Sequence, residues 1–132
     1  MIGRNYLLPL WISILGIIAS CLGPAPSEQI RLSDEELSFS CNKDSTEVTA
    51  KRSFRVEQVK FDDISLVRIH ENYDRTKFVF EEQWLRLKIY THEKRMEVVV
   101  QENNSTSSRR AVVYLSNGDA VAQLKITQTP HP

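Results

Sequence analysis

The chain has 132 residues, with 17 Lys or Arg and 17 Asp or Glu, so its formal net charge is zero. This length suits a single globular domain, and the lack of clustered positive charge argues against nucleic acid or an anionic membrane surface as a partner. Three of the four glycines lie before residue 24, which leaves Gly118 alone in the body of the chain. Glycine-rich phosphate cradles, dinucleotide-binding fingerprints and nucleophile elbows are therefore excluded.

Residues 1–20 have the features of a secretory signal peptide. Arg4 gives a positive start, residues 6–20 are almost continuously apolar, and small residues precede Cys21. A transmembrane helix needs about 20 apolar residues, and Pro9 interrupts this shorter run, which disfavours a permanent span. The segment ends in Ile18-Ala19-Ser20-Cys21, which resembles the lipobox of bacterial lipoproteins, where the Cys is acylated and becomes the first residue. The alternative is an ordinary cleavage site with Cys21 incidental.

Residues 21–31 are predicted to be the lipidated Cys followed by a flexible linker. Pro24 and Pro26 fix their φ angles and remove backbone donors, so this segment cannot hold a helix. Two or three acyl chains on Cys21 would make membrane attachment stable. The sequence therefore predicts a lipid-anchored protein of the bacterial cell envelope, at the outer membrane, with the membrane as partner through its N-terminal lipid.

From residue 32 onward, apolar and polar residues alternate in short runs, which predicts β-strands. Turns are expected at Asn42–Ser45, at Asp62-Asp63 and at Asn117-Gly118, the last a common two-residue hairpin signal. The number and spacing of the runs predict an all-β, antiparallel β-sandwich over residues 32–129, with a tail at 130–132. The expected strands are 37–41, 46–50, 54–61, 64–70, 78–80, 84–90, 96–101, 111–115 and 122–127.

The alternation also predicts which side chains form the core. Ala122, Leu124 and Ile126 in the last strand are expected to face inward, together with Leu37 and Phe39 in the first. Cys41 shares the face of Leu37 and Phe39, so it is interpreted as a small core residue and not as a reactive thiol. A domain of this size can stand without a disulfide.

Four stretches of the sequence follow one another in a recognisable order: Leu37-Ser-Phe-Ser, Trp84-Leu-Arg-Leu, the run from Glu102 to Leu115, and Leu124-Lys-Ile-Thr-Gln. Together they resemble the BACON domain, the Bacteroidetes-associated carbohydrate-binding often N-terminal family. The family shares an apolar opening strand, a Trp-Leu pair, an Asn followed by small polar residues and an Arg, and a closing strand that ends in Thr-Gln. The resemblance covers about residues 32–129 and implies an immunoglobulin-like β-sandwich.

The sequence departs from the family pattern at residues 54–75, where a long stretch precedes Trp84. For function, the resemblance implies binding of carbohydrate or mucin glycans, because such domains occur beside glycan-degrading modules and in surface lipoproteins. Some family members act instead as spacers. A structural or spacer role in an envelope or adhesin assembly, with other envelope proteins as partners, is therefore the alternative to glycan binding.

No catalytic or metal-binding constellation is found in the sequence. His92-Glu93 would begin a zinc-protease motif, but Met96 stands where the second His is needed. The acidic neighbours Asp62-Asp63 and Glu81-Glu82 would point to opposite faces of a strand, whereas the two acids of a glycosidase must flank one bond. We therefore expect no enzymatic activity, no cofactor and no metal, with a small hydrolase as the rival function.

Glycan binding needs an exposed aromatic ring and polar side chains beside it. Tyr73 lies in a polar stretch and is the preferred glycan-binding candidate, although its ring could also pack on the edge of the sandwich. Trp84 is better explained as a core residue. Ser45 lies in Asp44-Ser45-Thr46, which resembles a Bacteroidetes O-glycosylation sequon, although an unmodified turn explains it equally well. The aromatic candidates are Tyr73, Phe78, Trp84, Tyr90 and Tyr114.

Overall fold

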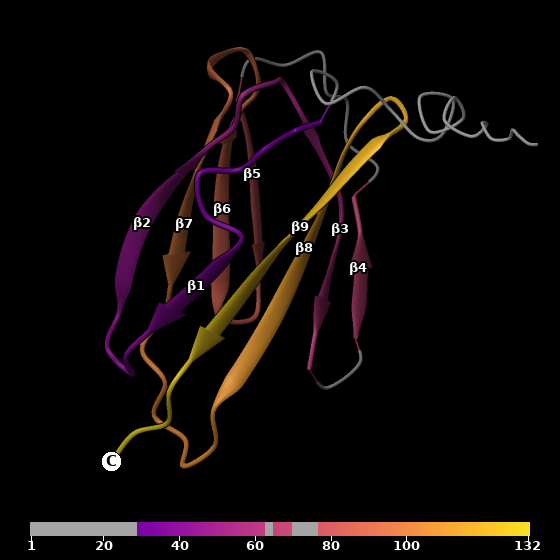
Figure 1. Ribbon diagram of the computed structural model, residues 1–132. Coiled ribbons are helices and arrows are strands. Elements are labelled where there is room, and N and C mark those ends of the chain that lie inside the picture. The colour runs from indigo at the N-terminus through magenta and orange to yellow at the C-terminus, as the bar shows by residue number, and fades with distance from the viewer. Residues whose placement is uncertain (1–28, 63–64, 70–76) are drawn as a thin grey trace, which may run out of the picture.

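The computed structural model describes residues 29–62, 65–69 and 77–132, and these residues form two β-sheets that pack face to face (Figure 1). The five-stranded sheet has the order β1-β9-β8-β3-β4, and the four-stranded sheet has the order β2-β7-β6-β5. The β-sandwich expected from the alternating pattern is confirmed. The strands are β1 Glu36–Phe39, β2 Asp44–Thr49, β3 Arg55–Phe61, β4 Leu66–Arg68, β5 Lys77–Glu82, β6 Leu85–Tyr90, β7 Arg95–Val100, β8 Arg109–Asn117 and β9 Ala120–Gln128.

The strand order is immunoglobulin-like, because the chain changes sheets four times, between β1 and β2, β2 and β3, β4 and β5, and β7 and β8. Every paired neighbour is antiparallel except β1 and β9, which run parallel. The predicted antiparallel sandwich therefore contains one parallel pair, β1 with β9. Before it joins β9, the chain forms a bridge between Leu32 and Ala50 at the edge of the other sheet, so the first segment contacts both layers.

The core lies between the sheets and is built from the inward-facing residues of the alternating strands. Leu124, Ile126 and Phe39 are buried, and Leu37 packs against the core half-buried. The predicted inward face of the first and last strands is therefore confirmed. Cys41 is only half-buried and is a free thiol, because the chain leaves β1 after Phe39 and turns toward the other sheet.

Two predicted boundaries are wrong. Asp44 and Ser45 belong to β2, where Ser45 lies opposite Val99, so the turn is confined to residues 41–43. Ile30, expected in the linker, is 1% exposed, and its carbonyl accepts a hydrogen bond from the Lys51 N–H at 3.0 Å. The sandwich therefore includes Ile30, because an apolar side chain and a backbone bond tie it to the β2 edge.

The expected hairpin between β8 and β9 is present, but its loop is shifted by one residue. Asn117 pairs with Ala120, so the loop residues are Gly118 and Asp119. Gly118 has a φ of 61°, and Asn117 does not adopt positive φ. One positive-φ glycine at the first loop position is the type II′ pattern, where the sequence suggested a type I′ turn over Asn117-Gly118.

The other predicted hairpin also forms: β3 pairs antiparallel with β4. A β-bulge between Val56 and Gln58 interrupts the pairing of β3 with β8, and it changes which side chains reach the outer face. None of the described segments is a helix with the length and apolar character of a membrane span. The predicted signal peptide, Cys21 and Tyr73 lie outside the described residues.

Candidate binding face

The structure separates the aromatic candidates into buried and surface residues. Phe78 and Trp84 are buried, at 9% and 7% exposure. The ring of Trp84 meets Phe61 edge to face at a centroid distance of 5.9 Å, and the guanidinium of Arg109 lies 4.9 Å from the Trp84 ring centroid. Trp84 is therefore a core residue, as the sequence interpretation favoured, and its ring is not free to stack on a sugar.

Tyr90 lies on the outer face of the four-stranded sheet, but cations cover its ring. The Arg95 guanidinium lies 3.8 Å from the ring centroid and the Lys77 ammonium 5.6 Å from it. Arg95 is held in place by hydrogen bonds to Glu93 at 2.6 Å and Glu47 at 2.8 Å. The hydrogen bond to Glu93 is the main cause that raises the pKa of Arg95. A sugar could reach this ring only by displacing an ion-paired side chain.

Tyr114 lies on the outer face of the five-stranded sheet and is half-buried. It pairs across β3 with Gln58 and across β9 with Gln123, so an amide side chain flanks the ring on each side. The bulge between Val56 and Gln58 gives β3 an extra residue opposite β8, and this shift in register places Gln58 opposite Tyr114. Within the described residues, no aromatic or cationic partner contacts the Tyr114 ring.

A shallow depression of about 540 Å³ lies next to Tyr114 on the same face. Lys60 and Lys125 both lie opposite Val112 in one cross-strand row. The carboxylate of Asp62 accepts a hydrogen bond from the backbone N–H of Arg110 at 3.0 Å. Among the described residues, Lys60, Arg110 and Lys125 form no ion pair. The face therefore offers an aromatic ring, amides and charged groups to a ligand that carries many hydroxyls.

The residues of the Asn-and-Arg motif hold one end of the sandwich together. Asn103 and Gln128 are both fully buried. The Asn103 amide donates to the carbonyls of Ser107 at 3.0 Å and Thr129 at 2.9 Å, and its oxygen accepts from the N–H and hydroxyl of Ser105 at 3.1 and 2.9 Å. One side chain thus fastens the 103–107 loop to the end of β9.

Arg109 continues this network. Its Nε donates to the Gln128 Oε1 at 2.8 Å, and an Nη donates to the carbonyls of Gln101 and Glu102 at 3.0 and 3.1 Å. Burial lowers the pKa of Arg109, against the opposing effect of the Asp62 carboxylate. These hydrogen bonds join the 101–107 segment to the start of β8 and the end of β9, so the motif residues hold this end of the sandwich together.

The remaining candidates are scattered. Ser45 is exposed, and its backbone N–H donates a hydrogen bond to the Asp44 carboxylate at 2.7 Å. His92 is exposed in a 3-10 turn after β6, and His131 lies in the tail. Within the described part of the chain, no three His, Cys, Asp or Glu residues are grouped so that they could hold a metal ion.

Sequence reasoning placed Tyr114 among five aromatics but preferred Tyr73. The signal for Tyr114 was the alternation of β8, which sends Ala111, Val113 and Leu115 inward and Tyr114 outward. Gln58 was missed, because a bulge that places it beside the ring depends on pairing between strands distant in the sequence.

Comparisons with known proteins identify only the fold. No protein-family model matches the sequence, and no curated protein matches it. The structure is similar to an NMR structure of a protein from Bacteroides thetaiotaomicron, with a TM-score of 0.63 and 18% sequence identity. The match covers 84% of this chain and 98% of that chain. At this identity the similarity establishes a shared β-sandwich and nothing about ligand or location.

Proposed function

We propose that this chain is a lipid-anchored protein of the bacterial cell envelope whose sandwich binds carbohydrate weakly and has no catalytic activity. The observation that carries the binding proposal is the Tyr114 ring, which lies without an aromatic or cationic partner among the described residues, between Gln58 and Gln123. An apolar ring face between two amides suits a pyranose, which has an apolar face and hydroxyls around its rim.

The face is open and shallow, which limits affinity. Each sugar hydroxyl exchanges hydrogen bonds to water for hydrogen bonds to protein, so the net gain per bond is small. One stacked ring with a few such bonds would give dissociation constants near 1 mM, or about 4 kcal/mol. Many copies anchored on one membrane would engage a polymer together, and this multivalency would compensate for weak single sites. Polysaccharides and mucin glycans are therefore the expected ligands.

The test is a glycan array followed by calorimetry on the secreted chain carrying Cys21→Ala. Tyr114→Ala should weaken binding at least about tenfold, because it removes the stacking surface. Tyr90→Ala is the matched control, since it removes a tyrosine from the outer face of the other sheet and should leave affinity unchanged. A Tyr73→Ala variant tests the candidate outside the described residues.

Each result has a defined meaning. If Tyr114→Ala binds like the wild type while Tyr73→Ala does not, the site belongs at Tyr73. If wild-type protein binds no glycan, a structural or spacer role in an envelope assembly replaces the binding proposal. Turnover of a glycan or peptide by the purified protein would overturn the assignment of a non-catalytic role.

The lipid anchor is tested separately. A labelled fatty acid should be incorporated into the wild-type protein expressed in a bacterium and not into Cys21→Ala, because the thiol of Cys21 is the expected acceptor. The matched control is Cys41→Ala, which removes the other cysteine and should leave labelling intact. Equal labelling of wild type and Cys21→Ala would refute the anchor.

A further inference from the structure

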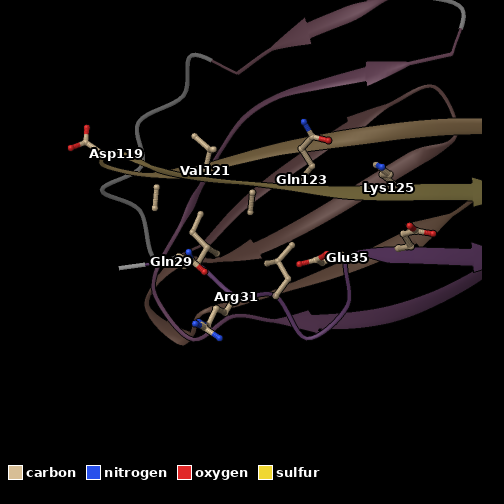
Figure 2. A pocket seen from close by; sticks show the side chains of 12 residues that line it. Gln29, Arg31, Glu35, Asp119, Val121, Gln123 and Lys125 are labelled. Carbon is tan, nitrogen blue, oxygen red and sulfur yellow. The ribbon is translucent and has the colours of Figure 1, made fainter. Parts of the chain in front are cut away.

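β9 is paired along its whole length with β8 but along only its second half with β1. The pairs with β1 run from Lys125 to Gln128, so the first half of β9 is an edge of the five-stranded sheet. A groove of about 630 Å³ lies along this edge. Figure 2 shows Asp119, Val121 and Gln123 along β9, with Gln29, Arg31 and Glu35 across the groove from them.

Along this half-strand, backbone groups that point into the groove have no partner among the described residues. The Lys125 N–H points toward β1, since it donates to the Glu35 carbonyl at 2.9 Å. Backbone groups alternate sides along a strand, so the N–H and C=O of Val121 and Gln123 point the same way. Within residues 29–62, 65–69 and 77–132, neither residue has a hydrogen bond across this edge.

The side chains at this edge are also unusual for an exposed strand. Val121 is 78% exposed, the largest exposure among the exposed large hydrophobic residues of the described chain. Charged side chains normally protect an exposed edge from pairing. On β9 itself they lie only at the two ends of the half-strand, at Asp119 and Lys125, and the opposite wall of the groove carries Arg31, Glu35 and Glu36. The edge is therefore able to accept another strand.

We propose that the first half of β9 pairs antiparallel with the same segment of a second copy of this chain. A twofold axis through the Val121 pair would place the two exposed valines directly opposite each other, with two backbone hydrogen bonds between them. Gln123 of each copy would lie opposite Asp119 of the other. The dimer would thus bury its own most exposed apolar side chain.

Two further features of the chain fit this register. The pairing between copies must stop before Lys125, because the Lys125 N–H already donates to the Glu35 carbonyl. At the same level, β9 of the second copy is preceded by its Gly118-Asp119 turn, so its strand does not extend further. Asp119 of the second copy would then lie diagonal to Lys125, a distance that a long side chain can span. Opposite charges would meet at both ends of the interface, and this complementarity favours a second copy over an unrelated strand.

The first experiment compares backbone and side-chain variants of the full chain in density-matched detergent, by sedimentation equilibrium. Val121→Pro removes the N–H that points into the groove but no hydrogen bond to β8, and it should weaken dimerisation at least about tenfold through two lost bonds per dimer. Val121→Thr, which keeps the N–H and the side-chain shape, should weaken it much less. Equal dimerisation of Val121→Pro and wild type would overturn the proposal.

A charge exchange tests the register without a proline. Asp119→Lys places like charges at both ends of the interface and should weaken the dimer severalfold, and the double variant Asp119→Lys with Lys125→Glu should restore it. A double variant that dimerises no better than Asp119→Lys would contradict this register.

Amide hydrogen exchange identifies the occupant of the edge. The proposal expects the Val121 and Gln123 amides to gain protection as the protein concentration rises. Protection that is independent of concentration would mean that another segment of the same chain covers the edge, and would overturn the proposal. A monomer with both amides unprotected up to about 1 mM would overturn it as well.

Discussion

At one end of the sandwich, which we call the closed end, β9 finishes at Gln128 and β8 begins at Arg109, and the buried Asn103 side chain makes four hydrogen bonds within the chain. At the other end, the open end, the turn of Gly118 and Asp119 leads into a half-strand whose outer edge has no partner among the described residues.

The contrast explains why a recognisable sequence motif says little about function in this protein. The Asn, Arg and Gln that carry the family resemblance are all used to satisfy buried backbone groups at the closed end. Of the exposed features that could contact another molecule, Tyr114 lies within the Glu102–Leu115 stretch but faces outward from β8, and Val121 lies outside all four stretches. Substitutions at the closed end should therefore affect stability most, and those at the open end should affect it least.

The largest effect is expected at Asn103. Asn103→Ala should lower the free energy of unfolding by about 3 kcal/mol, because it removes four hydrogen bonds of a fully buried side chain, including the one to the Thr129 carbonyl. The measurement is urea denaturation followed by Trp fluorescence. Asn104→Ala is the control, since the neighbouring Asn104 is exposed and should lose less than about 0.5 kcal/mol. Similar losses of stability for Asn103→Ala and Asn104→Ala would contradict the stabilising role of the Asn103 hydrogen bonds at the closed end.

Arg109→Lys should cost about 1–2 kcal/mol, because the single nitrogen of lysine cannot replace the separate Nε and Nη donors of the guanidinium and covers less of the Trp84 ring. Arg110→Lys is matched to it in chemistry and position. The hydrogen bond of Arg110 to Asp62 uses the backbone N–H, so its side-chain change should have little effect. Thermal unfolding of both variants measures the difference in stability between them. If Arg110→Lys were destabilised as much as Arg109→Lys, the specific role of the Arg109 hydrogen bonds would be contradicted.

Gly118→Ala tests the turn at the open end and should cost about 1 kcal/mol. An added Cβ meets no atom within 4 Å, so the cost comes only from the positive φ, which disfavours a side chain. Asp119→Ala, at the second loop position, should be close to neutral. An equal cost at both positions would mean that the positive φ of Gly118 is not the source of the loss.

The smallest effect on stability is expected at Val121. Val121→Ala should change the free energy of unfolding of the monomer by less than about 0.5 kcal/mol, because the side chain is already 78% exposed. Urea denaturation at low protein concentration is the suitable measurement. A large loss in the monomer would show that Val121 packs against residues outside the described part of the chain.

The alternation of apolar and polar residues was sufficient to predict a β-sandwich, the core positions Phe39, Leu124 and Ile126, and two hairpins, because these features depend on local periodicity and turn chemistry. The place of Trp84 in the Trp-Leu pair favoured it as a core residue, and its burial confirms this. Local pattern could not indicate that β1 runs parallel to β9, since strand partners far apart in the sequence are selected by packing of the whole chain.

Only the tertiary structure decided what the surface residues can do. Tyr90 and Tyr114 look alike in the sequence, as outward residues of alternating strands, but Arg95 and Lys77 cover the ring of Tyr90. Val121 is exposed because β1 joins β9 four residues later, at Lys125. Burial by cross-strand neighbours depends on register and sheet order, and these arise from contacts between segments that the sequence alone does not bring together.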